Sequence, residues 1–202
     1  MKFTEWGYTR PDYSEVKLKI DDCKNKMQNA LSYQMFRNAW LDIKKEMEYM
    51  TFQEEIVYIR QLCGIDYQSS LKEVEIQNRE DPPVYALRDE CDRLAAASGY
   101  CNELEQEFGK QIFAHIDQHR AGMNPDSIRL QSEESTLKMQ YKNLMAKNNP
   151  DEEALYQAFR KLMEIRCELA DSLGYNSYID LGYHMEGRKD YGTGETADFR
   201  RH

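Results

Sequence analysis

Residues 33–62 read YQMFRNAWLDIKKEMEYMTFQEEIVYIRQL, and this stretch points to the fold class. Its apolar residues recur mostly at spacings of three and four, which places them on one face of an α-helix. The apolar stripe consists of Phe36, Trp40, Ile43, Met47, Met50 and Val57. No convincing alternating strand pattern and no Asn-Gly or Asp-Gly hairpin signal occurs in the chain. The sequence therefore predicts an all-α protein, in which residues 33–62 form one long helix or two helices that meet near Thr51.

Capping residues and glycines on either side of this stretch indicate further helices. Asp12 and Glu15 have the spacing of a capping box. Asp81, Asn124 and Asn149 each precede a proline, and proline suits the first position of a helix because the N–H there is unpaired anyway. The glycines that follow periodic segments, and that suit helix ends, are Gly64, Gly99, Gly122 and Gly174. The predicted helices span residues 12–29, 32–62, 67–80, 82–98, 101–121, 125–146, 150–173 and 176–186.

The connections between these predicted helices are short, which favours antiparallel neighbours. A second apolar stripe consists of Leu155, Phe159, Leu162, Leu169 and Leu173. We therefore expect about eight helices in an antiparallel helical bundle or in stacked helical hairpins, with residues 1–188 as a single helical domain. Residues 189–202 have little apolar content, so we expect a loose C-terminal tail there. No internal repeat of fixed period is visible, which argues against a solenoid.

The formal net charge of −9 over 202 residues argues against a nucleic-acid partner, because an acidic chain repels phosphate backbones. Only Lys44-Lys45 and Arg200-Arg201 form short basic pairs. No segment approaches the roughly 20 apolar residues that a membrane span needs, and no signal peptide is readable near Met1. We expect a cytoplasmic protein without a nucleic-acid or membrane partner.

The five cysteines are widely spaced, odd in number and free of any C-x-x-C pair. They are Cys23, Cys63, Cys91, Cys101 and Cys167. This usage predicts reduced, mostly structural thiols in a reducing compartment.

His115 and His119 lie four residues apart in a predicted helix and are the candidate metal ligands. A zinc-peptidase helix has Glu directly after the first His, where it acts as general base, but this chain has Ile116. Catalytic zinc also needs a third protein ligand. Neither His184 nor His202 is followed by Glu. The more common interpretation is a pair of surface histidines, so we expect no catalytic residue, no metal and no cofactor in this chain.

The fourteen tyrosines are unusually numerous. Those on or beside apolar stripes include Tyr49, Tyr58, Tyr141 and Tyr156. Such residues are more often half-buried, with the hydroxyl at the surface, than part of a binding groove. A minority of them would suit a groove for an extended peptide, although the sequence does not single out the peptide-binding residues.

Residues 169–191, LADSLGYNSYIDLGYHMEGRKDY, resemble a segment of the oligoendopeptidase F group of thimet-type zinc oligopeptidases. The similarity rests on two Leu-Gly-Tyr triplets followed by Gly187-Arg188 and Asp190-Tyr191. Earlier segments agree with the family in the same order. They are Phe3–Pro11, Ile59-Arg60 with Asp66-Tyr67, Phe108–Phe113 and Leu130–Tyr141.

This resemblance implies the N-terminal helical lobe of such an enzyme, truncated and internally shortened after Met145. In the family, the lobe forms a wall of a deep channel that admits short, unfolded peptides. Full-length relatives bind zinc through His-Glu-x-x-His and a later Glu, beyond the region that this chain matches. The resemblance therefore transfers no catalytic or metal-binding residue to this chain.

Several hypotheses follow, and the sequence leaves open whether the chain is an enzyme. One is a peptidase fragment that is inactive alone and works with a separate catalytic half. A second is a stand-alone helical module that binds peptides or other proteins, and such a lobe would also self-associate through exposed apolar surface. A third is an enzyme that acts through His115 and His119. A fourth is a remnant without activity.

Overall fold

The computed structural model describes residues 7–113, 116, 123–146, 149, 151–186 and 191–201. Within these ranges the chain forms eight helices and no strand, which confirms the all-α prediction. The chain divides into two compact units, Met1–Glu107 and Phe108–His202. Each unit is described by itself below, and the predicted single domain over residues 1–188 stays a prediction.

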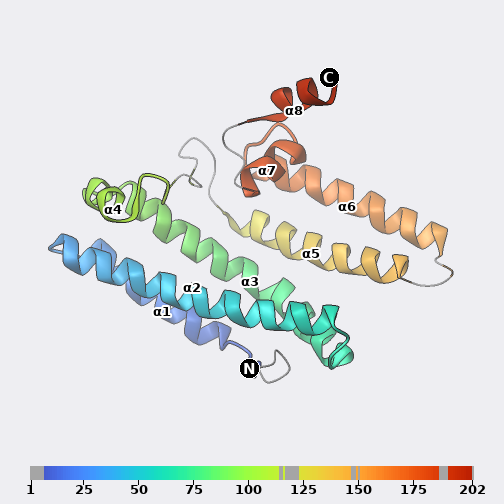
Figure 1. Ribbon diagram of the computed structural model, residues 1–202, viewed down its shortest axis with the longest axis horizontal. Helices are drawn as coiled ribbons and strands as arrows, with labels where there is room; N and C mark the ends of the chain where they lie inside the picture. The colour runs from blue at the N-terminus through green and yellow to red at the C-terminus, as the bar shows by residue number, and fades with distance from the viewer. Residues whose placement is uncertain are drawn as a thin grey trace. The chain divides into compact units, whose positions relative to one another are not determined.

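The first unit is built on three long helices that pack against one another (Figure 1): α1 (Tyr13–Gln28), α2 (Tyr33–Leu62) and α3 (Tyr67–Ala96). Consecutive helices run in opposite directions, as their short connections predict. Helix α2 is continuous through Thr51, so the single-helix alternative is confirmed. All six residues of its predicted apolar stripe are buried. From α1 and α3, the buried side chains include Val16, Ile20, Met27, Val84, Cys91 and Ala95.

Helix α3 contradicts one predicted boundary. Two helices were expected on either side of residue 81, but Pro82 and Pro83 lie inside one continuous helix. An interior proline removes a helical hydrogen bond and clashes with the preceding turn. Here Pro82 and Val84 are buried where α3 packs on α1 and α2, and this packing outweighs the local preference for a helix end.

Helix α4 (Cys101–Phe108) is much shorter than the helix predicted over residues 101–121. The reason is Gly109, whose φ of +95° lies in the left-handed region and ends the helix. The aromatic ring of Tyr100, just before α4, packs against Phe36 of α2 with ring centroids 5.3 Å apart.

The second unit begins with a hairpin of two long helices, α5 (Pro125–Met145) and α6 (Glu152–Ser172) (Figure 1). Helix α7 (Tyr178–Met185) contacts α6. Asn124 caps α5 as predicted, whereas α6 is capped by Asp151 rather than by Asn149. The core of this unit consists of Leu130, Leu137, Leu162, Ile165, Leu169, Ala170, Leu173, Tyr175 and Leu181.

The predicted loose tail contains a short helix, α8 (Thr193–Arg201), which contacts α7. Its start is held by polar contacts, because Glu195 accepts a hydrogen bond from Gly192 N and the Tyr183 hydroxyl donates to Thr196. No residue of α8 is buried, in agreement with the low apolar content of this segment.

All five cysteines are free thiols, as expected for reduced residues. Across the described part of the chain, every helix is too short or too polar to span a membrane.

Candidate functional site

The predicted metal ligands cannot be placed, since His115 and His119 lie outside the described residues, as does His202. His184 is described on α7, where its ring centroid lies 5.6 Å from that of Tyr175. The described residues contain no group of three or more His, Cys, Asp or Glu side chains that could hold a metal ion.

A groove between α5 and α6 in the second unit has a volume of about 510 Å³. Its lining residues are Leu137, Gln140, Asn143, Leu144, Ala154, Gln157, Ala158 and Lys161. The groove exists because Ala154 and Ala158, one turn apart on α6, are too small to fill the space beside Leu137 and Leu144 of α5.

The polar lining of this groove suits a peptide backbone. Gln140 and Asn143 offer both amide donors and carbonyl acceptors. Gln157 donates to Glu153 at 2.6 Å, and its own carbonyl oxygen remains an acceptor. Lys161 forms no ion pair with any described residue and supplies a cation to the groove. An apolar floor with a few polar groups at its edge is the usual composition of a ligand-binding cleft.

The other flank of the α5–α6 hairpin exposes aromatic and apolar side chains. Phe159, expected in the apolar stripe, is 47% exposed, and its ring centroid lies 6.2 Å from that of Tyr141. Tyr156 and Met163 are also exposed, so Tyr156 is not the half-buried residue that the sequence suggested. Phe159 departs from the prediction because it lies at the edge of the stripe, where α5 covers only one side of α6.

A buried carboxylate fixes the hairpin that carries the groove. Glu134 of α5, 2% exposed, accepts hydrogen bonds from Arg166 of α6 at 3.0 Å and from Tyr178 of α7 at 2.7 Å. Lys138 lies 3.2 Å away on the next turn. Burial alone would raise the pKa of Glu134, but Tyr178, Lys138 and Arg166 together bring it below its usual value. The charge is therefore stabilised by three helical elements and holds them together.

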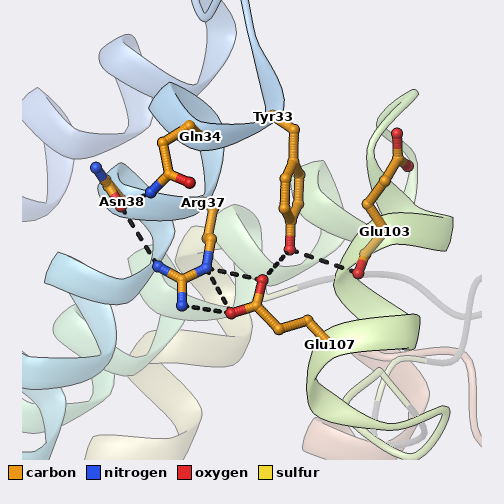
Figure 2. Close-up of polar contacts among 6 residues, drawn as sticks. All are labelled: Tyr33, Gln34, Arg37, Asn38, Glu103 and Glu107. Carbon is orange, nitrogen blue, oxygen red and sulfur yellow. Dashed lines mark hydrogen bonds and ion pairs between the residues drawn. The ribbon is translucent and has the colours of Figure 1, made fainter.

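Another polar cluster joins α4 to the start of α2 (Figure 2). Arg37 forms a two-pronged ion pair with Glu107, and its Nε lies 2.8 Å from Oε2. The Tyr33 hydroxyl also donates to Glu107. The pKa of Glu107 is lowered by its hydrogen bonds from Arg37 and Tyr33. Because the donors of this cluster are already bound to Glu107, its role is to dock α4 on α2 rather than to bind a ligand.

A second buried carboxylate, Asp92 of α3, pairs with two residues of α2. Its Oδ1 accepts from Trp40 Nε1 at 2.9 Å and lies 2.7 Å from Lys44 Nζ. These contacts fix the register of α3 against α2.

Sequence reasoning did not find the groove. The one usable signal was the pair Ala154 and Ala158 on a helix that is otherwise rich in large residues. That spacing indicates a groove only once the facing residues of α5 are known.

Comparisons with known proteins agree with this arrangement. The profile of the family described as Peptidase M3 N-terminal domain matches residues 3–121. A comparison with curated proteins gives no match. In the comparison with solved structures, the chain is similar to a PZ peptidase A with a bound inhibitor, with a TM-score of 0.81 and 22% identity over 99% of this chain and 42% of that one.

Two structures assigned as oligoendopeptidase F are also similar. One has a TM-score of 0.82 at 22% identity, and the alignment covers 100% of this chain and 42% of that chain. The other, from Bacillus anthracis str. Ames, has a TM-score of 0.84 at 21% identity, covering 100% of this chain and 44% of that chain. The chain thus spans less than half of the length of these relatives, and at such identities the likeness shows the fold. Since the family profile covers more than half of the sequence, the chain belongs to the Peptidase M3 N-terminal domain family.

Proposed function

We propose that this chain is the helical, channel-wall part of an oligopeptidase-type scaffold, which contacts short peptides and does not hydrolyse them by itself. The observation that carries the proposal is the likeness in fold, which extends over the full chain but less than half of each solved peptidase. Its 202 residues contain no His-Glu-x-x-His, so the zinc and the general base would come from residues outside this sequence. The hydrolytic activity would then belong to the complete catalytic assembly in the cytoplasm.

A second candidate function is a stand-alone helical module that binds peptides. The groove between α5 and α6 favours this function, because it combines an apolar floor with Gln140, Asn143 and Lys161 at its edge. The two functions share the same contact with a peptide and differ only in whether a catalytic half is also needed.

Peptide binding tests the contact that both functions require. We expect short fluorescein-labelled peptides to bind the purified chain saturably, as measured by fluorescence anisotropy. Ala158→Trp fills the groove and should weaken binding at least about tenfold, or about 1.4 kcal/mol. Ala197→Trp, the same change on the exposed surface of α8, should leave the affinity unchanged.

Equal affinity for the wild-type chain and Ala158→Trp would place the peptide elsewhere. An absence of saturable binding would contradict both functions. Mass spectrometry of the peptides after incubation distinguishes binding from cleavage, and we expect the peptides to remain intact.

A further inference from the structure

Among the described residues, four buried side-chain atoms lack a hydrogen-bond partner, and they come from α1 and α3 of the first unit. They are Tyr13 Oη, Gln77 Nε2, Asp81 Oδ1 and Arg88 Nε. Buried polar groups are nearly always paired, so each exception calls for an explanation. Two of the four, Tyr13 and Asp81, are neighbours.

Asp81 lies where three helices meet. Tyr13, the first residue of α1, is 8% exposed, and its hydroxyl faces the Asp81 carboxyl. The pair falls outside the limits of an ordinary hydrogen bond, but the hydroxyl still favours the charged form of Asp81 and offsets part of the rise in its pKa. Among the neighbouring carboxyl groups, Glu54 of α2 raises the pKa of Asp81 the most. Tyr85, one turn after Asp81 on α3, places its hydroxyl 2.8 Å and 2.7 Å from the two oxygens of Glu54. Two partly buried carboxyl groups, the partly buried phenol of Tyr85 and the buried phenol of Tyr13 therefore share one site, the Asp81 cluster.

Within the described ranges, no ion pair neutralises the two carboxyl groups of this cluster, although the Arg88 guanidinium lies over the Tyr85 ring, 5.2 Å from its centroid. Neither Asp81 nor Glu54 forms an ion pair with a described Lys, Arg or His, and the charged group next to Asp81 on α3 is another acid, Glu80. The cations nearby are engaged elsewhere, because Lys17 and Arg79 both pair with Glu80. The groups that face Asp81 are thus Tyr13 from α1, Glu54 from α2, and Glu80 and Tyr85 from α3.

Two ionised carboxylates in such a place lose hydration and repel each other. Burial, followed by the charge of Glu54, raises the pKa of Asp81 to about 7. Burial also raises the pKa of Glu54 and of both phenols, so the tyrosines remain protonated. Neutral Asp81 would gain an O–H donor in a region rich in acceptors. Pro82 and Pro83 add to that richness, because they leave two α3 carbonyl groups without their helical donors.

The cluster lies beside the segment that leads into α1. The backbone N–H of Thr9 donates to Gln53 of α2 at 2.8 Å, and the Tyr8 hydroxyl donates to Glu73 of α3 at 2.8 Å. Arg10 also pairs with Glu73. Residues 8–10, here called the N-terminal strap, therefore cross the same helices that hold the Asp81 cluster.

We propose that Asp81 is a proton-binding site of the folded protein, and that its ionisation loosens the docking of the N-terminal strap and the first turn of α1. The carboxyl proton leaves to solvent, and no other group changes its covalent state. Charge repulsion between Asp81 and Glu54 then separates α2 from α3 at the point where Tyr13 packs.

Proton binding by Asp81 is thermodynamically coupled to folding, and this coupling sets the direction in which pH changes the stability. The folded state binds the proton more tightly than the unfolded chain, so this contribution to stability is complete below about pH 4 and is lost as the pH rises to about 7. Carboxylates with cationic partners, such as Glu73 and Glu80, have a lowered pKa and act in the opposite direction.

Carbon-detected NMR of the side-chain carboxyl groups tests the proposal on the wild-type chain. We expect Asp81 to titrate near pH 7, against about 3.9 for an ordinary aspartate. Asp81→Asn should remove this titration. A midpoint of Asp81 within about one unit of the ordinary aspartate value would overturn the proposal.

Hydrogen exchange measures the predicted loosening. Corrected for the intrinsic rate, protection of Thr9 and the first turn of α1 should fall at least about tenfold from pH 5.5 to 8 in the wild-type chain. Asp81→Asn should keep its protection, whereas the matched change Asp89→Asn on the same helix should behave as the wild type. If Asp81→Asn does not fold, Tyr13→Phe and the wild-type titration still decide the question. Protection that is independent of pH in the wild-type chain would refute the coupling.

Discussion

Asp81 and Asp92 lie three turns apart on the same helix, and their surroundings differ both in burial and in the partners of the carboxyl group. Asp92, 1% exposed, is paired with Lys44 and Trp40, whereas Asp81 faces Glu54 and has no described cation within reach. Asp92 is buried, whereas Asp81 is partly buried. The charge of Asp92 joins α3 to α2, while that of Asp81 would push the same two helices apart. A cationic partner therefore determines whether a carboxyl group that is shielded from water stabilises this fold.

Glu134 extends the comparison to the second unit. It is as buried as Asp92 and has two cations and a phenol as partners. The stabilising effect of the paired carboxylates Asp92 and Glu134 should thus depend strongly on their partners. The contribution of the Asp81 cluster to stability should depend on pH.

The largest effect is expected for Lys44→Met, which removes the cation from buried Asp92. We predict a loss of about 3 kcal/mol in the free energy of unfolding, since an uncompensated charge remains inside the protein. Urea denaturation followed by circular dichroism measures it. Lys45→Met is the control, because Lys45 is exposed and its pair with Asp42 should contribute less than about 0.5 kcal/mol. Equal losses for the two variants would show that the pair contributes no more than a surface contact.

Arg166→Met should have the next largest effect. The change removes the hydrogen bond from α6 to Glu134 but leaves Lys138 and Tyr178, so we predict a loss of about 2 kcal/mol. The loss should be greatest at neutral pH and should shrink as acid protonates Glu134. Arg160→Met, which removes an exposed pair with Glu164 on the same helix, serves as the control. A loss that does not change with pH would mean that Arg166 acts through packing alone.

A smaller effect is expected for Tyr85→Phe in the Asp81 cluster. This change removes the one donor that hydrogen-bonds to Glu54 within the described part of the chain, and the pKa of Glu54 should then rise further. We predict a loss of about 1.5 kcal/mol at pH 8 and less at pH 5, where Glu54 is closer to neutral. Denaturation of Tyr85→Phe at both pH values checks it. A larger loss at pH 5 would contradict the assignment of Glu54 as an acceptor.

The smallest effect is expected for Gly109→Ala at the end of α4. The added Cβ meets no atom within 4 Å, so only the strain of φ at +95° remains, which costs about 1 kcal/mol. Thermal unfolding should detect a small decrease. An increase would indicate that residue 109 can adopt helical dihedrals and that α4 can extend toward the predicted length.

The helices with strong local signals could be predicted from the sequence. The cap at Asp12, the stripe of α2 and the Asn124-Pro125 start of α5 all lie where these patterns placed them. The predictions from these patterns were wrong where tertiary packing determines the helix boundaries. The sequence alone cannot show that burial of Pro82 carries α3 through two prolines, or that Gly109 adopts a positive φ.

The candidate sites were harder to predict. The α5–α6 groove depends on which faces of two helices meet, and the Asp81 cluster unites residues 13, 54, 81 and 85, which no local motif connects. The histidine pair that the sequence did single out, His115 and His119, lies outside the described residues, so its role as a metal site stays a prediction.

The most direct test is hydrolysis of a quenched fluorogenic peptide by the purified chain, measured first with added Zn²⁺ and then with a chelator. It decides whether this helical lobe catalyses peptide hydrolysis by itself. We predict no chelator-sensitive turnover, because the 202 residues contain no His-Glu-x-x-His to hold a zinc ion and its attacking water. Turnover that the chelator abolishes and Zn²⁺ restores would contradict the proposed non-catalytic role.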